Sequence, residues 1–140
     1  MTLSKVLLID SNRCRGCGRC EMACSFVHEG LFLPASSRIR LARLEDNVSV
    51  IPVVCQQCNE PWCTFACPTN ALIKDYDTDI VSLDPDKCIG CLQCFFTCPF
   101  GGITLSPNRL PIKCDLCEGE PRCAEACDYQ AIEYVELEHA

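Results

Sequence analysis

Short apolar runs alternate with polar turns along the whole chain, and no run approaches the 18 residues of a membrane span. Residues 5–10 and 131–137 are predicted to be strands near the two ends. Three further pairs of runs flank polar turns and predict hairpins, over 39–44 with 48–54, 71–74 with 80–83, and 102–105 with 110–113. An α+β fold is therefore expected, with short helices after four of the cysteines: Cys24, Cys67, Cys98 and Cys127.

Cysteine changes this picture more than any other residue type, because 16 of the 140 residues are cysteines. That share is typical of a fold held by cross-links or metals. The apolar run at residues 6–9 is too short for a secretory signal, so a cytoplasmic location is expected, where thiols stay reduced. The net charge of −7 argues against a nucleic-acid partner.

The cysteines fall into four blocks of four, and none is left over. The blocks begin at Cys14, Cys55, Cys88 and Cys114. Blocks one and three have gaps of two, two and three residues, which is the spacing of bacterial ferredoxins that bind [4Fe–4S] clusters. Proline follows the last cysteine of blocks two and three, and we expect Pro68 and Pro99 to begin helices.

Structural zinc is the alternative interpretation, since four zinc sites with four thiolates each would also use all the cysteines. Such sites usually combine two cysteine pairs separated by a longer stretch. In blocks one and three only two residues separate the third cysteine from the pair. This spacing fits the ligands of a cubic [4Fe–4S] cluster and is too short for the tetrahedral ligands of a zinc ion. The histidines lack the spacing of a Rieske site or a zinc finger. His28 is expected to face solvent, and His139 to lie in a frayed terminus.

An internal repeat relates the ends of blocks two and three. Residues 67–73 match residues 98–104, and residues 127–132 match them more loosely. Residues 55–105 are therefore predicted to form an inner ferredoxin-like unit. This unit is nested within an outer ferredoxin-like unit formed by residues 1–54 plus 106–140. In two-cluster ferredoxins the fourth cysteine of a block binds the other cluster, so the nesting predicts cross-ligation.

Cross-ligation divides the thiols into four sets, one for each of four expected [4Fe–4S] clusters. The outer unit supplies set 1 (Cys14, Cys17, Cys20 and Cys127) and set 2 (Cys24, Cys114, Cys117 and Cys123). The inner unit supplies set 3 (Cys55, Cys58, Cys63 and Cys98) and set 4 (Cys67, Cys88, Cys91 and Cys94).

Other residues lie close to these thiols in the sequence. Lys87 precedes Cys88 and Lys113 precedes Cys114, and each lysine is expected either against a cluster or in an exposed loop. Large aromatic side chains are expected to fill the core, as such residues usually do. They are Trp62, Phe65, Phe95, Phe96 and Phe100.

These features resemble the four-cluster ferredoxin-like subunits of multi-subunit redox enzymes. The resemblance covers nearly the whole chain and rests on the block order, the wider gap between Cys58 and Cys63, and residues 113–117. The family includes the electron-transfer subunits of dimethyl sulfoxide reductase, formate dehydrogenase, hydrogenase and carbon monoxide dehydrogenase. The short length and residues 34–40 look most like the small subunits of tungsten-containing aldehyde oxidoreductases.

The resemblance implies a non-catalytic electron-transfer subunit in anaerobic metabolism. Its expected partners are a catalytic subunit, such as a tungsten- or molybdenum-pterin aldehyde oxidoreductase, and a flavin subunit or soluble acceptor. The alternatives are a subunit of a hydrogenase, carbon monoxide dehydrogenase or formate dehydrogenase, a free polyferredoxin, and more remotely a zinc-stapled interaction module. Exposed clusters at its ends would also allow copies to associate end to end.

Overall fold

The computed structural model describes residues 3–45 and 49–138. Its strands are β1 (Leu3–Ile9), β2 (Arg40–Arg43), β3 (Val50–Val53), β4 (Leu72–Asp75), β5 (Ile80–Leu83), β6 (Ile103–Leu105), β7 (Pro111–Lys113) and β8 (Ile132–Glu138). Its helices are α1 (Arg19–Glu29), α2 (Trp62–Ala66), α3 (Gln93–Thr97) and α4 (Arg122–Ala126), with short 3₁₀ turns at Pro34–Ser36 and Leu116–Gly119. The α+β prediction is confirmed. Within the described ranges, no helix has the length and apolar character needed to cross a bilayer.

The described strands form four separate antiparallel pairs. Three of these, β2–β3, β4–β5 and β6–β7, are the predicted hairpins. Residues 46–48 of the first hairpin lie outside the described residues, as does His139. The fourth pair joins β1 to β8 from opposite ends of the chain, with a register from Leu3 opposite Glu138 to Ile9 opposite Ile132. The sequence predicted both of these strands but not their pairing.

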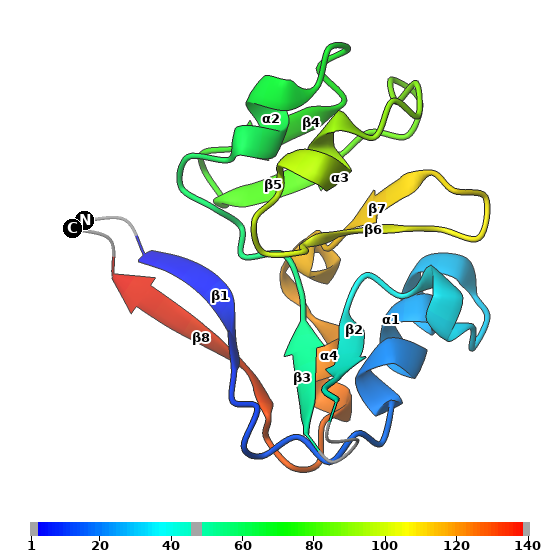
Figure 1. The fold of residues 1–140 in the computed structure, drawn as a ribbon. Helices are drawn as coiled ribbons and strands as arrows, with labels where there is room; N and C mark the ends of the chain where they lie inside the picture. Colours follow the sequence, from blue (N-terminus) through cyan, green and yellow to red (C-terminus); the bar gives the residue numbers. More distant parts are fainter. Residues whose placement is uncertain (1–2, 46–48, 139–140) are drawn as a thin grey trace.

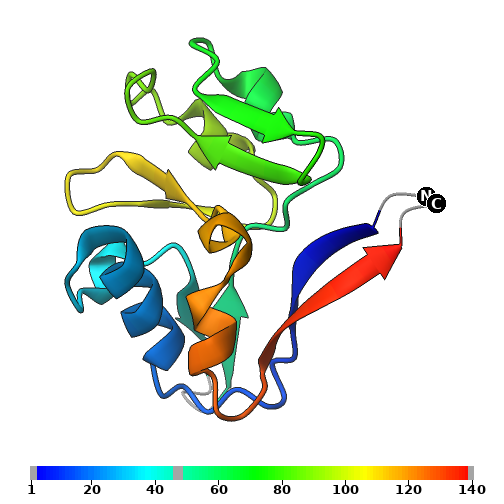
Figure 2. The same cartoon turned by 180° about the vertical axis from the view of Figure 1, so that it is seen from behind.

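The β6–β7 hairpin lies between two groups of elements. Figure 1 shows α2, α3, β4 and β5 on one side of it and α1, α4, β2 and β3 on the other, with the β1–β8 ribbon extending away. Figure 2 shows the same arrangement from behind. Helix α1 packs against α4, and α2 packs against α3. Blocks one and four therefore face each other, as do blocks two and three. The predicted unit boundary, between residues 105 and 106, lies at the end of β6.

Two small cores hold these groups together. The first contains Ile39, Val54, Leu116 and Ile132 together with four buried thiols, those of Cys20, Cys24, Cys114 and Cys123. The second contains Leu72, Val81 and Ile103 with the thiol of Cys94. Because thiols make up half of the first core, its packing depends on whatever those thiols bind.

In blocks two, three and four the helix precedes the fourth cysteine, so the prediction of helices after Cys67, Cys98 and Cys127 is wrong. Helices α2, α3 and α4 each contain the third cysteine and end at the fourth, whose backbone is extended. Proline disfavours the α conformation in the residue before it. Pro68 and Pro99 therefore end helices and do not begin them. In block one Ser25 follows the fourth cysteine, Cys24, and α1 continues through it to Glu29.

The prediction that the large aromatic residues fill the core is wrong for most of them. Phe95 packs against the second core. Four others are exposed, namely Trp62, Phe65, Phe96 and Phe100. The five-residue helices α2 and α3 direct their cysteines toward the interior, which leaves their other faces in solvent.

Candidate iron–sulfur centre

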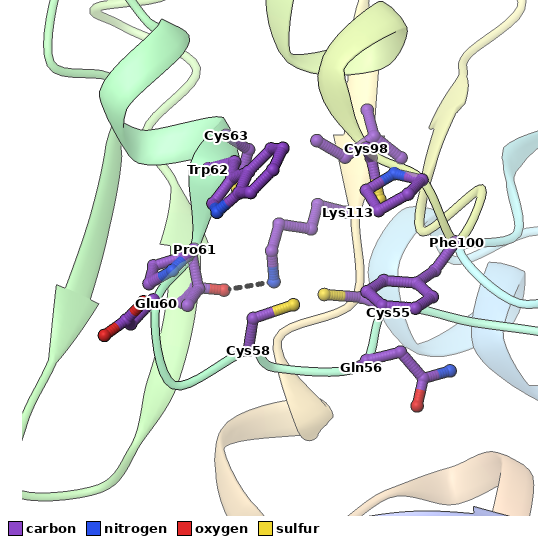
Figure 3. Close-up of a pocket in the computed structure, with 13 residues that line it drawn as sticks. Cys55, Gln56, Cys58, Glu60, Pro61, Trp62, Cys63, Cys98, Phe100 and Lys113 are labelled. Carbon is purple, nitrogen blue, oxygen red and sulfur yellow. Dashed lines mark hydrogen bonds between the residues drawn. The ribbon is translucent and has the colours of Figure 1, made fainter.

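All sixteen cysteines are free thiols, and the fold gathers them into groups. The largest thiol-lined cavity has a volume of about 320 Å³ and is bordered by the four cysteines of set 3. Figure 3 shows the Cys55 and Cys58 sulfurs within it, with Trp62 and Phe100 at its border. The side chains that line it are apolar, except for the thiols and for Gln56, Glu60 and Lys113.

Two smaller cavities are lined by other predicted sets. One is bordered by the four cysteines of set 4, and another by the four cysteines of set 1. The thiols of set 2 lie together as well. Cys123 is close enough to Cys24, Cys114 and Cys117 for their charges to raise its pKa, after the larger effect of burial. The structure thus brings together the members of each predicted set; their role as cluster ligands is proposed below.

The loop after the first cysteine of each block contains a residue in the left-handed region. The residue two positions later has a positive φ in all four blocks: Gly16 (71°), Gln57 (49°), Gly90 (73°) and Leu116 (57°). In three blocks its N–H donates to the sulfur of that first cysteine, at 3.4 Å for Cys55, 3.4 Å for Cys88 and 3.3 Å for Cys114. Glycine signals this conformation in blocks one and three, whereas nothing in the sequence marks Gln57 or Leu116.

The fourth cysteine of each block also accepts a backbone hydrogen bond. In blocks two, three and four the donor is the amide four residues later, and each donor–sulfur distance is 3.3 Å; the pairs are Ala71 with Cys67, Gly102 with Cys98, and Ala131 with Cys127. In block one the Arg38 amide donates to Cys24 at 3.2 Å instead. Amides directed at sulfur stabilise negative charge there, as iron–sulfur clusters require.

Burial opposes that negative charge when no metal is bound. It raises the pKa of Cys20 to about 12, of Cys63 to about 11 and of Cys114 to about 12. A coordinated metal reverses this, because it deprotonates the thiols that bind it. One guanidinium nitrogen of Arg38 is buried with no hydrogen-bond partner among the described residues. The donor set, the amides and this unsatisfied cation all fit an anionic iron–sulfur cluster.

His28 does not face solvent, so that prediction is wrong. Its Nε2 lies 3.1 Å from Asp115 Oδ1, and its Nδ1 lies 2.9 Å from the Cys24 carbonyl oxygen and 3.7 Å from the Cys24 sulfur. Hydrogen bonding to Asp115, and next to Cys24, raises the pKa of His28 to about 10. Burial raises the pKa of Cys24, but hydrogen bonds from His28 and the Arg38 amide outweigh burial and lower it overall. The sequence signal for this contact was the four-residue spacing of Cys24 and His28, which places both on one face of a helix.

The two lysines that precede cysteines have different environments. Lys87 is exposed. Lys113 is only 4% exposed and borders the set 3 cavity. Of the two alternatives left open by the sequence, the exposed loop holds for Lys87 and the buried position beside the thiols holds for Lys113.

Comparison with known proteins gives two family matches. Residues 47–137 match the 4Fe-4S dicluster domain, and residues 5–26 match the 4Fe-4S binding domain. The polyferredoxin-like subunit of aliphatic sulfonate oxidoreductase from Pyrococcus furiosus is 42% identical over 123 residues, which cover 86% of this chain and 70% of that protein.

Two further similarities extend over the whole chain. The probable anaerobic dimethyl sulfoxide reductase chain YnfG of Escherichia coli is 34% identical over 160 residues, which cover 99% of this chain and 76% of that protein. A chain of the active site complex BamBC of benzoyl coenzyme A reductase has a similar fold, with a TM-score of 0.60 and 24% identity. That alignment covers 100% of this chain and 80% of the BamBC chain.

Proposed function

The chain belongs to the 4Fe–4S dicluster ferredoxin family of iron–sulfur electron-transfer subunits, and we propose that it carries four [4Fe–4S] clusters and relays electrons within an oxidoreductase complex. The cluster ligands are sets 1 to 4, as defined above. The observation that carries the proposal is the gathering of sixteen free thiols into four groups, three of which border cavities of their own.

The protein supplies thiolates, amide donors and a water-poor environment, and a bound [4Fe–4S] cluster supplies the capacity to gain and lose one electron. The amides four residues after Cys67, Cys98 and Cys127 hold these sulfurs in place. The largely apolar lining of the set 3 cavity limits contact between solvent and its four thiols, all of which are partly buried. No cysteine remains outside the four sets, so we assign no catalytic residue to this chain. We propose that a partner subunit makes and breaks the bonds of the substrate.

The four sets follow one another in a row. Set 1 adjoins set 2, because Cys20 and Cys123 lie in the same buried core. Set 2 adjoins set 3, because Cys55 packs against the core that contains Cys114. Sets 3 and 4 share the second core, against which both Cys63 and Cys67 pack.

The two exposed cysteines lie at opposite ends of this row. They are Cys17 in set 1 and Cys91 in set 4. In the proposed relay, electrons enter at one of these ends and leave at the other. The same exposed ends are where copies of the chain would meet if they associate end to end.

The proposed partner at one end is a catalytic subunit, with a tungsten- or molybdenum-pterin aldehyde oxidoreductase as the specific proposal. A flavin subunit or a soluble acceptor would occupy the other end, in the cytoplasm. The support is the similarity to a polyferredoxin-like subunit of an oxidoreductase.

Anaerobic purification of the tagged chain from its source tests this function. We expect about sixteen irons and sixteen sulfides per chain, brown absorbance that dithionite bleaches, and a large subunit that co-purifies at a constant ratio. A colourless, zinc-rich preparation would contradict the clusters and favour the zinc-stapled module. A brown chain that never retains a second subunit would instead identify a free polyferredoxin.

A further inference from the structure

Lys113 lies at the junction of sets 2 and 3. It is the last residue of β7 and directly precedes Cys114 of set 2. Its side chain also borders the cavity that holds the four thiols of set 3, and Figure 3 shows it extending among them. A single buried ammonium group therefore adjoins two predicted clusters.

The ammonium group of Lys113 contacts only neutral acceptors. Its Nζ donates to the carbonyl oxygens of Val81 at 2.5 Å and Cys114 at 2.8 Å, and to Gln57 Oε1 at 3.3 Å. Gln57 in turn donates from Nε2 to the Cys114 carbonyl at 2.8 Å, and its Oε1 accepts from the Val81 amide at 2.8 Å. Among the described carboxylates, none forms an ion pair with Lys113.

Lys74 provides an internal comparison. It is also buried, at 9% exposure against 4% for Lys113, and its Nζ donates to the carbonyl oxygens of Cys58 at 2.8 Å and Asn59 at 3.1 Å. Unlike Lys113, Lys74 has a carboxylate partner, Asp79, at 3.5 Å. The charge of Lys74 is therefore compensated within the protein, whereas that of Lys113 is not.

A buried ammonium group is costly unless it has an anionic partner. The cavity that Lys113 borders is lined by the four cysteines of set 3 and by one carboxylate, Glu60, with which Lys113 forms no ion pair. The Lys113 Nζ lies 2.8 Å from the carbonyl oxygen of Cys114, a residue of set 2, and the Lys113 side chain borders the cavity lined by the four cysteines of set 3. The lysine therefore favours negative charge on both sides of the junction.

Building on the function proposed above, we propose that the buried ammonium group of Lys113 raises the reduction potentials of the second and third clusters. Reduction adds an electron to an already anionic site, so a fixed neighbouring cation stabilises the reduced form more than the oxidised form. Because the group is buried, salt screens its effect weakly. The two middle clusters thus hold electrons more tightly than they would beside a neutral residue, and Gln57 orients the ammonium group between them.

Two variants of the complete chain with its clusters test this role. Lys113→Met removes the charge and keeps an unbranched side chain. Gln57→Glu keeps Lys113 but places a carboxylate where its Oε1 now lies, 3.3 Å from the ammonium nitrogen. The control is Lys74→Met combined with Asp79→Asn, which removes a buried lysine together with its carboxylate partner. The readout is a potentiometric titration followed by electron paramagnetic resonance, with Cys117→Ser and Cys58→Ser identifying the signals of sets 2 and 3.

At a fixed ambient potential, we expect Lys113→Met to raise the oxidised-to-reduced ratio of the second and third clusters at least tenfold. For a one-electron couple this is a potential shift of about 59 mV. Gln57→Glu should shift the same two clusters in the same direction, and the control should shift neither as far. The first and fourth clusters should change by less than about twofold, because their ligands lie farther from the charge.

Unchanged potentials in both variants, or an equal shift of all four clusters, would overturn the role of Lys113 while leaving the proposed function intact. Loss of clusters from both variants but not from the control would make Lys113 a structural residue and would also overturn its role. A wild-type chain without iron and sulfide would overturn the proposed function, and this role with it.

Discussion

His28 Nε2 lies 3.1 Å from Asp115 Oδ1 and so ties helix α1 to the loop of block four. Each residue is next to a thiol of set 2: His28 through the Cys24 sulfur at 3.7 Å, and Asp115 through its position between Cys114 and the 3₁₀ turn. The ion pair therefore connects two segments, separated by 87 residues, that supply the same predicted cluster.

Replacing His28 by glutamine should accelerate cluster loss in guanidinium chloride, because the hydrogen-bonded ion pair with Asp115 disappears. The expected loss is about 1–2 kcal/mol. Asp115→Asn should have a similar effect, and the double variant should be little worse than either single one. The measurement is the rate at which the brown absorbance bleaches, since equilibrium unfolding is ill-defined for a chain with tightly bound cofactors.

The His28 contribution should also depend on pH in a defined direction. The pKa of His28 is raised from 6.5 to about 10, so its contribution is complete below pH 6.5 and is lost as the pH rises through about 10. Hydrogen bonding to His28 lowers the pKa of Asp115 below 3.8, so that contribution is lost only as the pH falls through the lowered value. The ratio of bleaching rates, His28→Gln to wild type, should therefore decline from neutral to strongly alkaline pH; a constant ratio would contradict the ion pair.

Gly102→Ala should disturb set 3 specifically. A Cβ at Gly102 would lie 2.7 Å from the Cα of Cys55, closer than real Cβ contacts occur. The Gly102 amide also donates to the Cys98 sulfur. We expect the loss of one cluster, about four of sixteen irons, as measured by iron analysis.

Gly30→Ala is the matched control for that variant. Gly30 has a φ of +73°, and apart from its two chain neighbours no described residue has a heavy atom within 4 Å of the position that an alanine methyl group would take. Alanine there adds backbone strain of about 1–2 kcal/mol without crowding a cysteine. This variant should keep its full iron content. Full iron in Gly102→Ala as well would show that Cys55 and Cys98 do not need their present positions.

Cys91→Ser should remove or convert the fourth cluster. Cys91 is exposed and lies in set 4, and a serine hydroxyl is a poorer ligand for cluster iron than a thiolate. Iron analysis and electron paramagnetic resonance should show the loss of about one to four irons, with slower electron transfer and an intact partner cofactor. Ile89→Ser changes an exposed residue of the same loop and should retain all the iron. Unchanged iron in Cys91→Ser would contradict its assignment as a ligand.

Ile39→Ala should weaken the first core. Ile39 is 1% exposed and packs with the buried thiols of sets 1 and 2. The expected cost is about 2–5 kcal/mol from lost burial and the cavity left behind. Ile51→Ala, on β3 with 36% exposure, should cost far less. Equal bleaching rates for the two variants would show that this core does not stabilise the clusters.

Several parts of the molecule follow from the sequence because they depend on local spacing. The hairpins β4–β5 and β6–β7 lie where apolar runs flank polar turns. The fourfold division of the cysteines follows from gaps of a few residues, since short gaps bend the chain around a compact group of ligands. The helix positions do not follow from the cysteine spacing alone, because Pro68 restricts the backbone of Cys67 and so ends α2 before it.

The sequence by itself determined how many thiols the chain offers, how they are spaced and which chemistry they suit. Tertiary structure alone decided that β1 pairs with β8, that His28 reaches Asp115, and that Lys113 is buried without a carboxylate partner among the described residues. These relationships join residues far apart in the chain or depend on what surrounds a side chain. The physical reason is that burial and long-range contact arise from packing. The same local sequence, a lysine followed by a cysteine, is exposed at Lys87 and buried at Lys113.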